Sequence, residues 1–180
     1  MAVVCCNSGP LMALVKLDLL AQVFLLYPCI TISETVYHEV VTAGLSIGAK
    51  DAEVVDKFCR TKQITIFPSK EIKKVSLNVI SELHPGELET IKMALQIHAD
   101  YILLDDLDAR RVAEINIKEQ SGTTIVRGTL GILVELYEKN LISKAQFKEY
   151  LEAIKNRRDI WISSNLCHKL MEALEAGTLD

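Results

Sequence analysis

The chain has 180 residues, of which 49% are hydrophobic and 24% are charged, and its formal net charge is −4. This length and hydrophobic content suit one globular domain with a sizeable core and exclude a disordered tail. The negative charge gives no general attraction to nucleic acid, so any such binding would depend on local basic clusters. Charged residues such as Lys16 and Asp18 interrupt the longest apolar runs well short of the about 20 residues of a membrane span. The five cysteines are irregularly spaced and match no zinc pattern, so we expect reduced thiols in a cytoplasmic protein.

The first half of the chain alternates short apolar segments with helical patterns. Ala2–Cys6 is apolar and ends in Asn-Ser-Gly-Pro, which is typical of a buried strand followed by a turn. Ser33 is a favourable N-cap, and the helix that follows it should end before Gly44. Ser69–Leu83 reads as a loop with room for one short helix. The other segments are expected as strands at 29–32 and 64–67 and as helices at 11–15, 18–26, 34–42 and 51–60.

The second half continues the alternation and then becomes helical. Ser143 and Gln146 form the capping-box pattern of a helix start. Strands are expected at 101–104 and 123–126, an extended segment at 160–162, and helices at 84–99, 107–118, 128–139, 143–155 and 164–176. Short buried strands between helices indicate the α/β class, with a central parallel sheet of about four to five strands between two helical layers. We expect a single domain, made of an α/β core over 1–140 and a helical C-terminal extension over 141–180.

Two polar residues follow directly on expected strands. In a parallel sheet, sites form at the carboxyl ends of the strands, so Asn7 and Asp105 should emerge at the same edge. Helical periodicity, at about 100° per residue, then sorts the acids on the neighbouring helices. It places Glu87 on the apolar face of its helix, and it places Glu39 beside Val36 and Val40.

A cluster of buried carboxylates is costly unless a cation neutralises it. Oxygen ligands without cysteine or histidine favour Mg²⁺ or Mn²⁺. Such an ion activates water and stabilises the in-line transition state of phosphodiester cleavage. The pattern therefore predicts a metal-dependent phosphodiesterase.

Four motifs in order carry a resemblance that covers nearly the whole chain. They read CNSGPL at Cys6–Leu11, PGE at Pro85–Glu87, LLDDLDAR at Leu103–Arg110 and GTLG at Gly128–Gly131. The chain resembles the PIN-domain superfamily, in particular a poorly characterised prokaryotic branch with N/DTSPL, PGE, LLDDxxAR and GTLG motifs. The resemblance implies a three-layer α/β/α fold and a ribonuclease that uses Mg²⁺ or Mn²⁺ held by about four acids. It also implies RNA as substrate, a toxin role with an antitoxin-like protein as partner, and a homodimer.

Carried over residue by residue, the resemblance assigns four catalytic and metal-binding positions: Asn7, Glu39, Glu87 and Asp105. It points to three substrate-binding positions: Ser8, Arg110 and Thr129. The departure is Asn7, because an amide can ligate through its carbonyl oxygen but brings no charge. This substitution is compatible with weakened activity, a different substrate or a non-catalytic role.

Simpler interpretations stay open for the same residues. Glu87 would be favourable in the first turn of any helix, and Asp106 is expected to be the N-cap of the next helix. Arg110 and Arg111 could pair with the aspartates one turn away. The whole protein could be a PIN-fold binding or scaffolding protein with an incomplete site. A nucleotide-binding domain is disfavoured because no glycine-rich phosphate loop follows the first strand.

Two further expectations concern the C-terminal extension. Trp161 stands between Ile160 and Ile162, and this setting predicts that it packs between the extension and the core. Arg157 and Arg158 read as part of a solvated surface.

Overall fold

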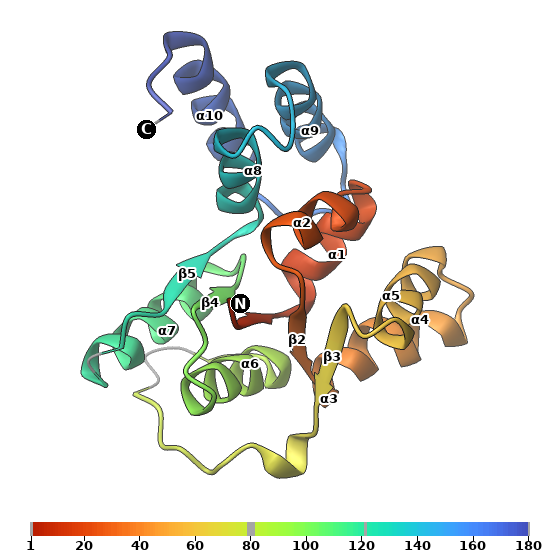
Figure 1. Cartoon of the computed structure of the whole chain (residues 1–180), viewed down its shortest axis with the longest axis vertical. Coiled ribbons are helices and arrows are strands. Elements are labelled where there is room, and N and C mark those ends of the chain that lie inside the picture. The colour runs from red at the N-terminus through yellow and green to blue at the C-terminus, as the bar shows by residue number, and fades with distance from the viewer. Residues whose placement is uncertain (1, 79–81, 121, 180) are drawn as a thin grey trace.

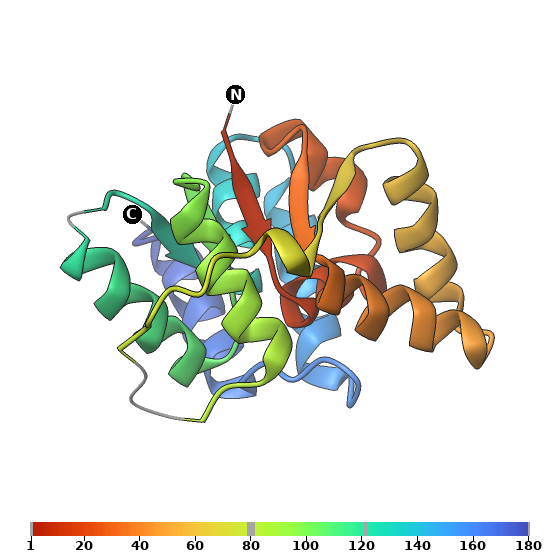
Figure 2. The same ribbon diagram turned by 90° about the horizontal axis from the view of Figure 1, so that it is seen from below.

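A five-stranded parallel sheet forms the centre of the protein in the computed structural model, which describes residues 2–78, 82–120 and 122–179 (Figures 1 and 2). The strand order is β3-β2-β1-β4-β5. The strands are β1 (Val4–Cys6), β2 (Ile30–Ser33), β3 (Ile64–Phe67), β4 (Tyr101–Leu103) and β5 (Ile125–Arg127). Cys6 pairs with Leu103 and Ser33 pairs with Phe67, so the strands end at nearly the same level. The predicted α/β class with a parallel sheet is confirmed.

Helices cover both faces of this sheet. In the first half they are α1 (Ser8–Lys16), α2 (Leu20–Leu26), α3 (Glu34–Tyr37), η1 (His38–Thr42), α4 (Ala43–Ser46), α5 (Lys50–Arg60) and η2 (Ser69–Glu71). In the second half they are α6 (Pro85–Gln96), α7 (Leu107–Glu119), α8 (Thr129–Glu138), α9 (Lys144–Asn156) and α10 (Ser164–Ala176). Figures 1 and 2 show α6 and α7 on one side of the sheet and α1, α2 and α8 on the other. In the part of the chain that the structure describes, no helix is long and apolar enough to cross a membrane.

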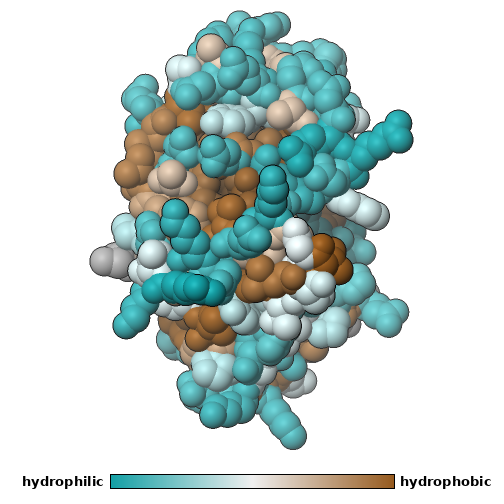
Figure 3. All heavy atoms as spheres, turned by 90° about the vertical axis from the view of Figure 1, so that its right-hand side faces the viewer, coloured by the Kyte–Doolittle hydropathy of each residue, from teal (hydrophilic) through white to brown (hydrophobic). Residues whose placement is uncertain are grey.

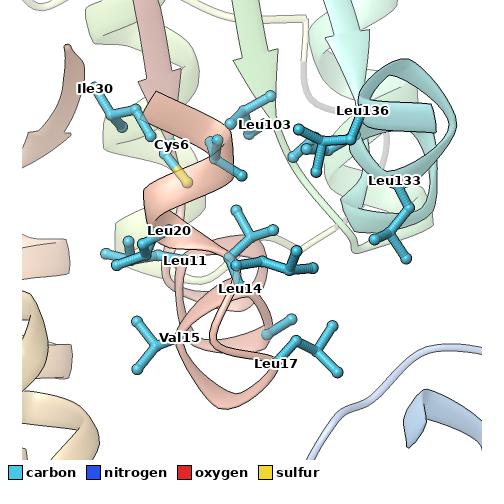
Figure 4. Close-up of a cluster of buried hydrophobic side chains, with 14 of the residues drawn as sticks. Cys6, Leu11, Leu14, Val15, Leu17, Leu20, Ile30, Leu103, Leu133 and Leu136 are labelled. Carbon is cyan, nitrogen blue, oxygen red and sulfur yellow. The ribbon is translucent and has the colours of Figure 1, made fainter. Parts of the chain in front are cut away.

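The adjacent cysteines of β1 show how the two cores are divided. Successive strand residues point to opposite faces of a sheet. Cys5 belongs to the core beneath α6 and α7, and Cys6 belongs to the larger core around α1, α2 and α8. Figure 4 shows the larger core, in which Leu14 of α1 lies on the side of that helix toward Leu133 and Leu136 of α8, and Val15 lies on the opposite side. All five cysteines are free thiols, as expected.

The C-terminal helices complete the larger core. Figure 1 shows α8, α9 and α10 together at one end of the molecule. Their buried contributions include Leu133, Phe147, Leu151 and Leu174. The predicted capping box is confirmed, because Ser143 and Gln146 exchange side-chain to backbone hydrogen bonds at the start of α9. The boundary at residue 140 between core and extension stays a prediction.

The helical segment after β2 departs from the expected geometry. Ser33 caps α3 as predicted, but the segment does not end before Gly44 and instead continues to Ser46. Between α3 and α4 the chain forms a π-helical turn, His38–Thr42. A π turn holds more residues than the 3.6 of an α-helix, so it rotates the positions that follow. Val41 is buried as a result, whereas Ala43, which α-helical phase turns inward, is exposed.

Smaller differences lie at element ends. The last strand is Ile125–Arg127 and not 123–126, and residues 160–162 belong to no strand. The expected loop 69–83 contains the short helix η2, while its residues 79–81 lie outside the described part. On the side of the molecule where α4 and α5 lie, hydrophilic side chains dominate and hydrophobic ones form separate patches (Figure 3). This distribution fits the amphipathic α5, which buries Ala52 and Val55 and turns its charged residues outward.

Candidate functional site

The chain reverses direction across the sheet between β1 and β4. From β1 it moves outward through β2 to β3, and it then returns to β4 and β5 on the other side of β1. Ligand sites of open α/β sheets lie at such a switch point, outside the carboxyl ends of the strands. Asn7 follows β1 here, and its backbone N–H donates to Leu103 at the end of β4 (3.1 Å). Asp105 follows β4 by two residues, so both predicted residues lie at the switch point.

Asn7 occupies the N-cap of α1 without capping it. Asparagine at this position normally accepts a hydrogen bond from the first turn of its helix. The Asn7 side chain makes no such bond. It is only 6% exposed, and its Oδ1 atom is buried with no hydrogen-bond partner among the residues that the structure describes. A buried polar oxygen without a donor is costly and points to a missing ligand or ion.

Asp105 is held by one residue across the sheet edge. Its Oδ1 accepts from the backbone N–H of Thr129 and its Oδ2 accepts from the Thr129 hydroxyl, both at 2.7 Å. Burial raises the pKa of Asp105 above its ordinary value, against the opposing effects of these two bonds and of the Arg110 charge. Thr129, predicted as a substrate-binding residue, therefore orients an acid in this structure.

Glu87 lies on the buried side of α6, as its helical phase predicts, with an exposed fraction of 8%. Its Oε2 accepts from the backbone N–H of His84 (3.0 Å), so it also caps its own helix. Burial raises the pKa of Glu87, and the charges of Asp106 and Glu39 add to the increase. The simple capping interpretation is thus true of Glu87, but capping does not explain why an acid is buried beside other acids.

Glu39 is the acid that the helical phase misplaces. The prediction that it faces inward with Val36 and Val40 is wrong, because it stands on the π turn and is exposed. Its carboxylate nevertheless reaches the start of α6. A β-carbon placed on Gly86 would lie 2.9 Å from both carboxylate oxygens of Glu39. Glu39 therefore approaches Glu87 from the outside, and its metal-binding role stays a prediction.

The charged residues next to Asp105 have different roles: one caps a helix, one forms an ion pair and one has no acidic partner among the described residues. Asp106 is the N-cap of α7, since its Oδ1 accepts from the N–H groups of Asp108 and Ala109 (2.9 and 2.8 Å). Arg111 pairs with Asp108, as the ion-pair alternative predicts. Arg110 has no acidic partner within 4.0 Å among the described residues, although it is close enough to lower the pKa of Asp105.

A groove of about 1090 Å³ opens at this edge of the sheet. Asn7, Ser8, Glu87, Asp105 and Arg110 line one part of it. Its other walls come from α1, α8, α10 and the segment before α10, and their lining side chains are largely apolar. Glu39 is not among the lining residues. The groove is large enough for an extended ligand that would reach the acids from the C-terminal helices.

The acids do not form a compact cluster on their own. Within residues 2–78, 82–120 and 122–179, no three His, Cys, Asp or Glu side chains are close enough to hold a metal ion. Glu87 and Asp105 line the same groove as Asn7, whose amide can ligate through its carbonyl oxygen but brings no charge. The free Oδ1 of Asn7 and the two carboxyl groups of raised pKa are suitable oxygen donors for a divalent cation.

Two glycines of the site were not assigned a role from sequence. A β-carbon on Gly128 would lie 2.9 Å from Oδ1 of Asp105 and 3.3 Å from the backbone oxygen of Leu104. Gly86 has the same relation to Glu39. Each glycine therefore gives an acid the room to lie against the backbone. The PGE and GTLG motifs contain this signal, but the close approach depends on segments distant in sequence.

Comparisons with known proteins identify the family. No curated protein and no solved structure matches this chain. A family model described as a PIN domain matches residues 3–176, which includes the C-terminal helices. The match agrees with the α/β fold and its five-stranded parallel sheet. The chain belongs to the PIN-domain family.

Proposed function

We propose that this protein is a metal-dependent nuclease that cleaves RNA at the switch-point edge of its sheet. PIN domains are in general nucleases and typically use divalent metal ions. The observation that carries the proposal for this chain is the free, buried Oδ1 of Asn7, in the same groove as two buried acids. All three groups lose their hydration on folding, and a protein partner compensates none of the three fully.

Asn7, Glu87 and Asp105 would hold Mg²⁺ or Mn²⁺, with Glu39 approaching from the far side of Gly86. The ion would supply the Lewis acid that activates water and neutralises charge on the phosphate. Thr129 fixes both oxygens of Asp105 and leaves each with a further lone pair. Arg110, which is half-buried and unpaired among the described residues, would bind a phosphate oxygen of the substrate. Ser8 lies on the same wall and would contact the RNA backbone.

Cleavage of a mixed RNA pool, with Mg²⁺ or Mn²⁺ and with a chelator, tests this function. We expect Glu87→Gln and Asp105→Asn to lose activity by about 100-fold or more, since each removes a charged ligand. Glu89→Gln is the matched control, because Glu89 stands on the same helix and bonds to Ser69 outside the groove. Equal activity in the wild type and in both site variants would exclude the assignment.

A second function has its own supporting observation. Asn7 brings no charge, and among the described residues no three His, Cys, Asp or Glu side chains are close enough to hold a metal ion. These features favour a PIN-fold protein that binds RNA or a protein without cleaving. RNA binding in a filter assay, combined with no cleavage at any Mg²⁺ or Mn²⁺ concentration, would support this function.

The biological setting belongs to the same proposal. The nuclease would act as the toxin half of a toxin–antitoxin pair in the cytoplasm, as a homodimer that an antitoxin-like protein inhibits. Light scattering on the purified protein measures the dimer. Growth arrest on expression of the wild type, and not of Asp105→Asn, is the result expected of a toxin.

A further inference from the structure

Trp161 is exposed in a way that its sequence setting does not suggest. The prediction that it packs between extension and core is wrong, because 93% of the residue is accessible to solvent. Tryptophan is large, apolar and on average well buried. Among the exposed large hydrophobic residues in the described part of the chain it is the most exposed, and it lines the groove that contains the acids.

Trp161 lies in the segment 157–163. The residues that precede Trp161 in this segment are bound to the end of α1. The Arg157 guanidinium binds both carboxylate oxygens of Asp159 (2.9 and 2.8 Å). It also donates to the backbone oxygen of Lys16 at the end of α1 (3.3 Å). Lys16 in turn donates to the backbone oxygen of Asp159 (2.7 Å) and pairs with its carboxylate. Arg157 is exposed, as expected of a solvated surface, and it also ties this segment to the end of α1.

Ile160, which follows Asp159, also holds the segment 157–163 against the rest of the protein. Ile160 is 6% exposed and lies in the larger core, and α10 begins three residues after Trp161. Trp161 is thus presented to solvent by anchored neighbours on both sides. An indole held open on an anchored segment is pre-organised to stack on a ligand, because little conformational entropy is lost on binding.

The charges along the groove indicate what that ligand is. Arg110 beside the acids and Lys169 on α10 both line the groove, and neither has an acidic partner within 4.0 Å among the described residues. An aromatic face and two unpaired cations at separate points of one groove suit a single-stranded nucleic acid, with a base on the ring and phosphates at the cations. The groove is also lined by four acids, Glu87, Asp105, Asp106 and Asp159. A purely apolar protein helix would leave both cations without a counter-charge.

We propose that Trp161 stacks on an unpaired base of a single-stranded RNA whose backbone follows the groove past Lys169 to Arg110 and the acids. The inference rests on the proposed function, because it names the residue that selects an unpaired substrate for that site. A base inside a duplex has no free face, so Trp161 favours single-stranded over double-stranded RNA.

The experiment uses the intrinsic fluorescence of the protein, since Trp161 is its one tryptophan. The full chain is titrated in a chelator with a single-stranded RNA of about 12 nucleotides, and separately with the same sequence as a duplex. We expect saturable quenching of the emission by the single strand and much weaker quenching by the duplex. Binding by an end-labelled RNA gives the affinity of variants that have no tryptophan.

In that second measurement, Trp161→Ala should weaken binding by about tenfold, while Trp161→Phe should lose less than about threefold. Ile47→Ala is the control, because Ile47 is 82% exposed at the end of α4 and does not line the groove. Unquenched emission on RNA binding, or equal affinities of the wild type and Trp161→Ala, would overturn the proposal. A blue shift of the emission that grows with protein concentration, and that RNA does not reverse, would overturn it in favour of a second copy of the chain.

Failure here differs from failure of the nuclease function. Quenching in chelator together with no metal-dependent cleavage supports the role of Trp161 and rejects catalysis. Metal-dependent cleavage with an unchanged KM in Trp161→Ala supports catalysis and rejects the role of Trp161.

Discussion

Thr129 donates two hydrogen bonds to Asp105, one from its backbone and one from its hydroxyl, and so binds both oxygens of one carboxylate at 2.7 Å. Thr129 is the first residue of α8 and is fully buried, whereas Asp105 lies just before Asp106, the N-cap of α7. This pair fixes the direction in which the remaining lone pairs of Asp105 point. Because the two bonds come from different groups of Thr129, a substitution can remove the hydroxyl bond and keep the backbone bond.

We expect Thr129→Val to destabilise the protein by about 2 kcal/mol at pH 7, because it removes one hydrogen bond to a buried charge and keeps the volume. Without that bond, the pKa of Asp105 in the folded state should rise further above the ordinary value of 3.8. The loss should therefore be small below the ordinary pKa and should grow as the pH rises. Urea unfolding at about pH 3 and pH 7 measures this loss of stability. Thr129→Ser, which keeps the hydroxyl, should be closer in stability to the wild type than Thr129→Val.

Glycine substitutions provide a matched pair within one motif. At Gly128 a β-carbon would collide with Asp105 and come close to the Leu104 backbone, whereas at Gly131 it would meet the Arg127 side chain at ordinary distances of 3.8–4.0 Å. We expect Gly128→Ala to cost about 1–3 kcal/mol and most of the cleavage activity. Gly131→Ala, on a helix, should be neutral or slightly stabilising. Thermal unfolding of both variants measures the difference in stability. Equal changes in melting temperature would contradict the steric role of Gly128.

The buried acids should make the protein less stable at neutral pH than it would be without them. A carboxyl group whose pKa is raised on folding favours the folded state at low pH, and this contribution is lost as the pH rises through the folded-state pKa. Burial raises the pKa values of Glu87 and Asp105 in this way. We expect Glu87→Gln to gain about 1 kcal/mol at pH 7 while losing activity, with the gain vanishing near pH 3. A loss of stability at pH 7 would show that capping by Glu87 outweighs its burial.

Asn7→Asp tests whether the free amide oxygen faces the metal. A third carboxylate should tighten Mn²⁺ binding by about tenfold or more, because it adds a full charge to the ligand set. Without metal, the same change should lower the melting temperature, since it adds charge beside buried acids. Calorimetric titration with Mn²⁺ and thermal unfolding in chelator provide the two measurements. An affinity equal to or below that of the wild type would place Asn7 outside the site.

Local rules predicted the parts of the site that depend on local geometry. Asn7 and Asp105 follow strands whose ends the apolar pattern marks, and Glu87 lies on the buried side of a regular α-helix. Asp106 caps α7 because its side chain reaches N–H groups two and three residues away. Such features need only the strand period, the helix period and capping chemistry.

Features that depend on distant segments could not be predicted in this way. Thr129 meets Asp105 because β5 pairs with β4, and the segment that carries Trp161 is tied to the end of α1, which is distant in sequence, by Arg157 and Asp159. The predicted direction of Glu39 was wrong for a different reason. The π turn changes the number of residues per helical turn, and the sequence carries no obvious signal for it. For Thr129 and Trp161 the missing information is a set of tertiary contacts, whereas for Glu39 it is a local change of helix type.

The π turn also has a consequence for the history of the protein. A wider turn in a helix is the trace expected of a one-residue insertion that the helix absorbed without moving its ends. Relatives with an uninterrupted α-helix after β2 should then be one residue shorter between Ser33 and Ser46. In an alignment that places its gap elsewhere, the acid equivalent to Glu39 will be displaced by one column. Gaps placed within His38–Thr42 should instead keep the position of Glu39 in register with such relatives.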